Sequence, residues 1–93
     1  MIMITGRFEI DPAQREAFLT FARDLVLHER NEAGCLQFDM FEDVTTPNTF
    51  LMLEQWEDRD ALDAHTDTEV FEENDDRLNR FILGEPSWDE YEF

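Results

Sequence analysis

The chain contains no lysine, and its only basic side chains are seven arginines and two histidines. Against them stand 24 acidic residues, which give a formal net charge of −17 over 93 residues. A field of that sign repels phosphate backbones and anionic lipid headgroups. The composition therefore argues against nucleic-acid binding and against binding to a membrane surface.

Cysteine, glycine and histidine are also scarce. Cys35 is the only cysteine, so the chain has no intrachain disulfide and no cysteine metal cluster, and a small buried thiol is expected. The three glycines form no phosphate-binding loop, and no serine nucleophile motif is present. The two histidines lie too far apart to form a recognisable metal-ligand spacing. We therefore expect neither a metal nor a nucleotide cofactor.

Long apolar runs are missing as well. No run is long enough to cross a bilayer, and the N-terminus lacks the basic and apolar regions of a secretory signal. We expect a soluble, cytoplasmic protein.

The acidic residues are spread through every segment rather than gathered in a tail. Many carboxylates without lysine are typical of proteins from salt-loving organisms, although an acidic protein of a dilute cytoplasm is the alternative. In roughly molar salt the Debye length falls to about 3 Å, which screens the self-repulsion. We predict that the melting temperature rises steeply between low and molar salt. A flat profile in thermal scans would contradict the halophilic interpretation.

The pattern of apolar residues predicts one domain, residues 1–93, with the order β-α-β-β-α-β. Residues 2–10 alternate as a strand, and Asp11 with Pro12 begins a helix that ends near Gly34. The other expected elements are a strand with Leu36, Phe38 and Met40 on one face, a strand ending near 57, helices over 58–65 and 67–84, and a strand over 88–93. This is the ferredoxin-like order of an α+β protein with an antiparallel sheet.

The third strand is apolar on both faces. Phe50, Met52 and Trp56 point to one face, and Leu51 and Leu53 point to the other. A small antiparallel sheet usually leaves one face in water, so a strand of this kind needs two covers. The chain's helices supply one, and we expect a second copy of the protein to supply the other.

Taken in order, these segments resemble the antibiotic biosynthesis monooxygenase (ABM) family of small dimeric α+β barrels. The resemblance covers nearly the whole chain and is carried by Gly34-Cys35-Leu36, Pro47-Asn48-Thr49-Phe50, Glu54-Gln55-Trp56, Ala61-Leu62, Ala64-His65, Phe71 and Glu85-Pro86. It is more specific for the fold than for the chemistry, because one fold hosts many functions.

The resemblance implies a homodimer whose two sheets pack face to face, with a pocket between sheet and helices in each protomer. It also implies a monooxygenase that uses no flavin, metal or haem. In such enzymes a small aromatic substrate, such as a phenol, quinol or anthrone, loses a proton, and its anion passes an electron to dioxygen. The protein then supplies an apolar cavity, a base and a hydrogen-bond donor.

His65 and Trp56 are the candidate catalytic residues. An imidazole is neutral and able to accept a proton near pH 7, so His65 is the natural base. The structural alternative is a half-buried helix histidine bonded to a backbone carbonyl. Trp56 can stack on an aromatic substrate and donate its indole N–H, with core packing as the alternative.

Three further residues are candidate substrate contacts. Arg7 could hold a substrate oxyanion, although a salt bridge across the dimer is favoured. Tyr91 is a candidate second donor, with packing as the alternative, and Phe71 lies on the apolar face of the last helix. His28 fits a role at the solvent edge near a helix C-terminus.

Other functions remain open at this level. The chain could be a non-catalytic dimer that binds an apolar ligand or serves as an interaction module, or an isomerase that moves a proton with the same base. Haem binding or degradation, with His65 as the axial ligand, is less favoured. The first strand carries Thr5, Gly6 and Arg7 where haem degraders of this fold carry an asparagine, and the negative field suits haem propionates poorly.

Overall fold

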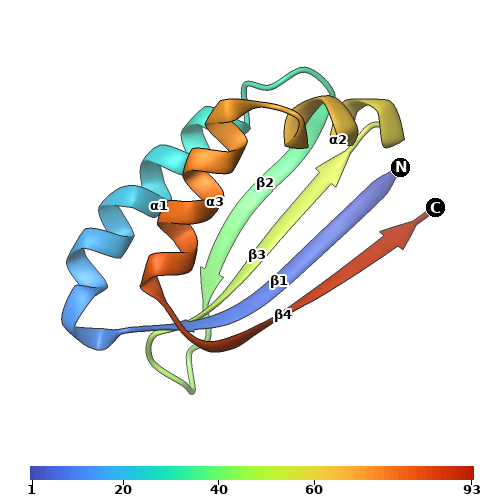
Figure 1. The fold of residues 1–93 in the computed structure, drawn as a ribbon. Helices are drawn as coiled ribbons and strands as arrows, with labels where there is room; N and C mark the ends of the chain where they lie inside the picture. The colour runs from blue at the N-terminus through green and yellow to red at the C-terminus, as the bar shows by residue number, and fades with distance from the viewer.

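A computed structural model describes all 93 residues as a four-stranded sheet with its helices on one side (Figure 1). The elements are β1 (Ile2–Ile10), a 3₁₀ turn η1 (Pro12–Gln14), α1 (Arg15–Glu29), β2 (Cys35–Glu42), β3 (Thr49–Trp56), α2 (Arg59–Thr66), α3 (Glu69–Phe81) and β4 (Ile82–Glu92). The strand order is β2-β3-β1-β4, and all three pairings are antiparallel. The predicted ferredoxin-like α+β fold is confirmed.

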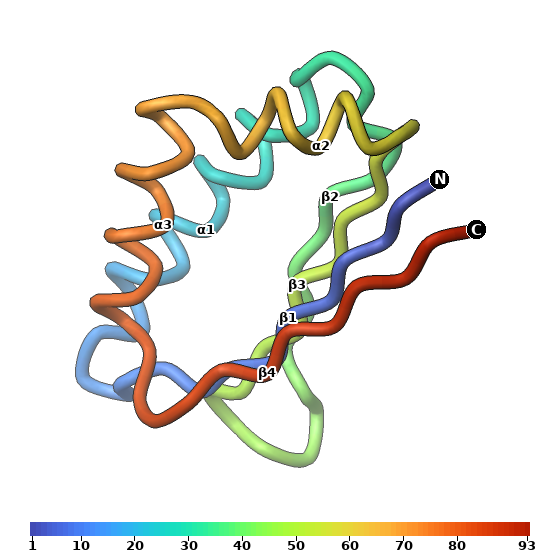
Figure 2. The backbone as a smooth tube through the Cα atoms, turned by 45° about the vertical axis from the view of Figure 1, so that its right-hand side comes forward, coloured from blue at the N-terminus to red at the C-terminus, as the bar shows by residue number.

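Helices α1 and α3 lie side by side against the sheet, and α2 spans from the end of β3 towards the start of α3 (Figure 2). The main core consists of aromatic and aliphatic side chains between these helices and the sheet. Phe18 of α1 is its centre, with ring centroids 4.8 Å from Phe50, 5.5 Å from Phe81 and 5.9 Å from Phe8. This cluster fills the end of the molecule away from α2.

The two faces of the sheet differ in cover. On the helix side, Phe50, Met52 and Trp56 are buried, as the alternation predicts. On the opposite side, which we call the outer face, no element of the chain covers the sheet (Figure 2). Leu51 and Leu53 are half-buried there.

The register places more apolar side chains on the outer face. Across the strands, Leu51 lies opposite Phe41, and Met3 lies opposite Tyr91. Phe41 is 51% exposed and Tyr91 48% exposed. The outer face therefore carries an apolar surface, in keeping with the expectation of a second cover.

Two details of the expected elements are wrong. Leu36 does not share a face with Phe38, because an irregularity in the β2–β3 pairing between Cys35 and Gln37 turns Leu36 outward, where it is 57% exposed. Ile82, expected in the last helix, begins β4 and pairs with Ile10. The chain leaves the helix there because Ile82 completes the sheet edge next to β1.

No helix in the structure combines the length and the apolar character needed to span a bilayer.

Candidate functional site

A cavity of about 220 Å³ lies between the sheet and the helices, at the end of the molecule where α2 sits. The sheet side of the cavity consists of Ile4, Phe38, Met52, Glu54 and Trp88. The helix side is apolar around Leu25, Leu62, Phe71 and Leu78 and polar around Glu29, His65, Thr66, Asn74 and Asp75. An apolar cavity with a few convergent polar groups is the usual form of a small-molecule site.

His65 lies in the last turn of the short helix α2. The first turn of this helix is capped by Asp58, whose side chain accepts a hydrogen bond from the Ala61 N–H at 2.8 Å. Thr68 caps α3 and also donates to the His65 carbonyl oxygen at 3.2 Å. These two caps hold the histidine where α2 meets α3.

Aromatic rings sandwich the imidazole of His65. Trp56 stacks on it, with centroids 4.4 Å apart and planes at 24°, and Phe71 meets it edge-on at 5.1 Å. His65 is only 5% exposed, and Trp56 is completely buried. The ring plane is therefore set by packing on both sides.

Two carboxyl groups face Nδ1 of this imidazole. The nitrogen lies 2.6 Å from Glu32 Oε2 and 3.1 Å from Glu29 Oε2. An ionised carboxylate can only accept, so the short contact assigns Nδ1 as the donor to Glu32. In the tautomer with the proton on Nδ1, the lone pair is on Nε2, which makes no hydrogen bond within the chain. His65 is thus arranged as a proton acceptor at a ring that lines the cavity.

Gly34 allows Glu32 to reach His65. Its φ of +80° suits glycine, and a Cβ at this position would come within 2.4 Å of the Ala61 Cβ. The turn between α1 and β2 can therefore pack closely against α2. The Gly34 carbonyl oxygen also accepts a hydrogen bond from the Glu57 N–H at 2.8 Å.

Trp56 contacts His65 and Glu54 rather than the cavity itself. Its ring lies behind His65 and does not line the cavity, and its indole N–H donates to Glu54 Oε1 at 2.8 Å. The N–H that the sequence offered to a substrate is thus already engaged, because Glu54 sits two residues away on the same strand face. Trp56 acts on the site by positioning the imidazole and Glu54.

The five predicted site residues are only partly brought together. His65, Trp56 and Phe71 form one cluster at the cavity. Arg7 and Tyr91 lie on the outer face instead, because Arg7 alternates with the buried Phe8 on β1 and Tyr91 pairs with the outward-facing Met3. Arg7 pairs with Asp43 of its own chain at 2.8 Å, and this guanidinium lowers the pKa of that carboxyl.

Trp88 is a cavity residue that sequence analysis did not single out. It pairs with Gly6 across the β1–β4 ladder, and its indole lies where a Gly6 side chain would be, 2.1 Å from a Cβ placed there. The signal was a glycine inside an otherwise regular strand, which often marks close approach of another group.

Glu29 and Glu54 are further cavity residues that the pattern obscured. Glu29 follows Leu25 by four positions on the buried stripe of α1, and Glu54 lies between Met52 and Trp56 on the covered face of β3. Both acids occupy core positions and are less than a tenth exposed. A buried acid at such a position is more informative than an exposed apolar residue.

Burial changes the ionisation of several groups near the cavity. Burial raises the pKa of Glu54, against the opposing hydrogen bond from Trp56. It raises the pKa of Glu29 more strongly, to about 8, with the charges of Glu32 and Glu54 acting in the same direction. Burial also raises the pKa of the Cys35 thiol, so this cysteine is not an activated nucleophile.

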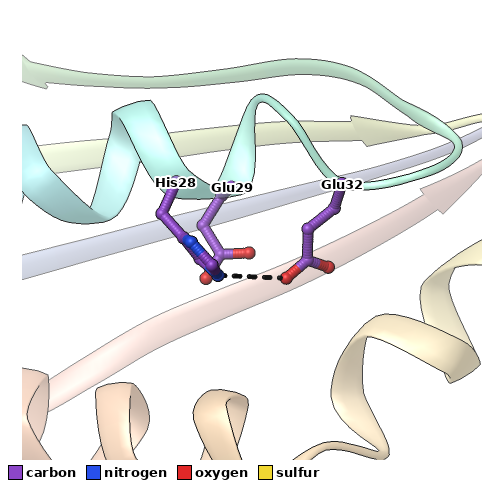
Figure 3. Close-up of side chains that lie close together, drawn as sticks. All are labelled: His28, Glu29 and Glu32. Atoms are coloured by element: carbon purple, nitrogen blue, oxygen red, sulfur yellow. Dashed lines mark ion pairs between the residues drawn. The ribbon is translucent and has the colours of Figure 1, made fainter.

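His28, Glu29 and Glu32 form the one group whose side chains could offer three ligand atoms to a metal ion, within 4.8 Å of one another (Figure 3). Glu32 Oε1 lies 3.7 Å from His28 Nε2, which is the pair drawn in Figure 3. The other carboxylate oxygen of Glu32 is bonded to His65. His28 is at the solvent edge of α1, as the sequence indicated.

Comparison with known proteins identifies the family of this chain. The model of the antibiotic biosynthesis monooxygenase family matches residues 1–74. The chain belongs to the ABM family. It is 43% identical over 72 residues to the protein "Putative monooxygenase YcnE" of Bacillus subtilis. The aligned stretch covers 77% of this chain and 76% of YcnE.

Solved structures agree with this ABM assignment. A crystal structure described as an antibiotic biosynthesis monooxygenase superimposes with a TM-score of 0.89 at 30% identity, over 100% of this chain and 98% of that one. The structure of PA3566 from Pseudomonas aeruginosa gives a TM-score of 0.80 at 34% identity, over 97% of this chain and 90% of the other. The ABM resemblance found in the sequence is confirmed, and with it a monooxygenase-type family.

Proposed function

We propose that this ABM protein is a cofactor-independent monooxygenase that oxidises a small phenol, quinol or anthrone-like substrate. The observation that carries the proposal is His65, which lines an apolar cavity and has Nδ1 bonded to Glu32. The cavity volume of about 220 Å³ is below the usual range of ligand sites, which begins at about 300 Å³, and favours a compact aromatic ring system. Phe71 and Trp88 line it and supply aromatic surface for such a ring.

The reaction balances in atoms and electrons without an added reductant. For an anthrone-type methylene, R₂CH₂ + O₂ gives R₂C=O + H₂O, so the substrate carbon supplies all four electrons that dioxygen accepts. One oxygen atom enters the product, and the other leaves as water with the two hydrogens from carbon. The protein must remove a proton from the substrate and return protons to reduced oxygen.

His65 suits the first step. Its Nε2 accepts the substrate proton, and the imidazolium that forms is stabilised by the Glu32 carboxylate at 2.6 Å. The substrate anion then transfers an electron to dioxygen. The apolar lining of the cavity strengthens each electrostatic interaction in this step.

The experiment that tests the function is oxygen uptake by the purified protein in molar salt, with anthrones and hydroquinones and no added cofactor. Product should form in proportion to the oxygen consumed. An isomerase with the same base would convert its substrate without oxygen uptake, and a binding module would bind without turnover. The observation against the module is that the cavity reaches His65 rather than being filled by aromatic side chains.

Haem fits this site poorly. The cavity of about 220 Å³ is too small for a porphyrin. The net charge of −17 would also repel the haem propionates.

We further propose that the protein is a homodimer formed through the outer face. Leu53 lies near the centre of that face, opposite Thr5 on one side and Asp39 on the other. Arg7 and Tyr91, on the same face, would then lie at the dimer interface. In this arrangement they contribute to a substrate site only if the partner's cavity opens towards them.

We predict that Leu53→Glu converts the dimer to a monomer, because a buried carboxylate without a partner is strongly unfavourable in an apolar interface. Light scattering after gel filtration measures the mass. Val44→Glu is the matched control, since Val44 is 98% exposed in the β2–β3 turn, and it should remain dimeric. A wild-type protein that is monomeric at tens of micromolar would overturn the dimer.

A further inference from the structure

Glu29 is a buried acid of the cavity to which the reaction outlined above assigns no role. It is the last residue of α1, it is 2% exposed, and it lines the cavity. Its Oε2 is buried and has no hydrogen-bond partner in the structure. A buried polar atom without a partner is uncommon and needs an explanation.

The groups that face Glu29 are almost all acidic. Glu32 follows in the turn after α1, Glu54 projects from β3, and Asp75 lines the same cavity from α3. The polar neutral neighbour is Asn74 of α3, and His28 precedes Glu29 on its own helix. No arginine is paired with Glu29.

His65 is the nearest cationic candidate, with Nδ1 3.1 Å from Glu29 Oε2. The proton on that nitrogen is directed to Glu32 Oε2, however, which is closer at 2.6 Å. Glu29 is thus left without a counter-ion among acids. A buried carboxyl in that position takes up a proton rather than remain charged.

The expected ionisation agrees with this geometry. Burial, the charge of Glu32, a side-chain hydrogen bond with Glu32 and the charge of Glu54 raise the pKa of Glu29 to about 8, while the Asn74 amide acts in the opposite direction. At neutral pH the side chain therefore carries an O–H group, which is a hydrogen-bond donor.

We propose that Glu29 is a neutral carboxylic acid that donates a hydrogen bond to an oxygen atom of the aromatic ligand in this cavity. This deepens the proposed function and rests on it for the identity of the ligand as a compact aromatic with a carbonyl, phenol or phenolate oxygen. The donor stabilises the negative charge that develops on that oxygen while His65 removes a proton. The two groups then divide the work of base and acid, because their surroundings differ.

Ligand binding tests the proposal without any turnover. The probe is 1-indanone, an aromatic ketone without a titratable group, and the reference is indane, the same ring system without the oxygen. Calorimetry gives the dissociation constants of both between pH 6 and pH 10, with far-UV circular dichroism to verify folding at each pH.

Wild-type protein should bind 1-indanone more tightly than indane below pH 8. The preference should fall about tenfold between pH 7 and pH 10, with a midpoint near pH 8, as the donor is lost. Glu29→Gln keeps an N–H donor at every pH, so its preference for the ketone should not change with pH. Asp76→Asn removes an exposed carboxyl of α3 that does not line the cavity, and this variant should titrate like the wild type.

Three results would overturn the proposal: no preference for the ketone below pH 8, a preference that does not change with pH in the wild type, or the same decline in Glu29→Gln. Oxygen uptake separates this outcome from that of the proposed function. If the wild type oxidises no substrate but shows the expected pH dependence of ketone binding, the monooxygenase fails and the role of Glu29 stands. If the wild type consumes oxygen with its substrate but the ketone preference of Glu29→Gln falls with pH as in the wild type, the monooxygenase stands and the role of Glu29 fails.

Discussion

Replacing His65 by alanine is expected to lower kcat for substrate-dependent oxygen uptake by about 10²–10⁴-fold, the usual contribution of a positioned general base. The reason is that the imidazole is the cavity group with a free lone pair on one nitrogen and a carboxylate on the other. The measurement is the initial rate with the best substrate of the quinol and anthrone panel.

His28→Ala is the matched control, because it removes the other histidine of the chain from a half-exposed position. Its rate should remain close to that of the wild type. Glu32→Gln should retain more activity than His65→Ala, and the acidic limb of its pH–rate profile should move to lower pH, because the imidazolium loses its anionic partner. Unchanged turnover in a folded His65→Ala would contradict the proposed mechanism.

Replacing Phe18 by alanine is expected to lower the free energy of unfolding by about 3–5 kcal/mol. Phe18 is completely buried, and its ring contacts Phe8, Phe50 and Phe81, so that it links α1 to two strands and to α3. Because domains of this kind are stable by only about 5–15 kcal/mol, the loss is a large share of the total. Urea titration in molar salt measures it.

The control for Phe18 lies on the same helix. Leu27 is 59% exposed, and Leu27→Ala should change the free energy of unfolding by no more than about 0.5 kcal/mol. If Phe18→Ala lowered the free energy of unfolding by less than about 1 kcal/mol, the core would be able to refill the space left by the ring. The aromatic cluster would then contribute less stability than we assign to it.

The order and type of the elements followed from local signals. The alternation in β1 and β3 placed their side chains on the correct faces, because side chains of a strand alternate with a period of two whatever the strand packs against. Asp11 with Pro12 marked the start of the first helical segment, and the Asp11 side chain accepts from the Ala13 N–H at 2.9 Å. Such signals depend on a few neighbouring residues, so they can be interpreted without knowledge of tertiary structure.

Local signals failed where a distant segment decided the outcome. The alternation placed Leu36 on the same face as Phe38, but it lies on the opposite face. The reason is an irregularity in the pairing of β2 with β3, which no residue type in β2 predicts. Ile82 has an apolar helical spacing but joins the sheet, because its backbone pairs with Ile10 at the far end of the chain. In both cases the competing interaction lies outside the window in which periodicity is measured.

The fold, the family resemblance and the choice of His65 as the candidate base could all be predicted from local sequence, because they depend on ordered short segments and on the rarity of histidine. The groups that surround that base could not be predicted in this way, because they depend on tertiary packing. Glu29 and Glu32, at the end of α1 and in the turn after it, meet His65 of α2 because Gly34 lets that turn pack against α2. Whether an acid is exposed or held neutral in a cavity depends on such long-range packing, which in a chain with 24 acids no local pattern can reveal.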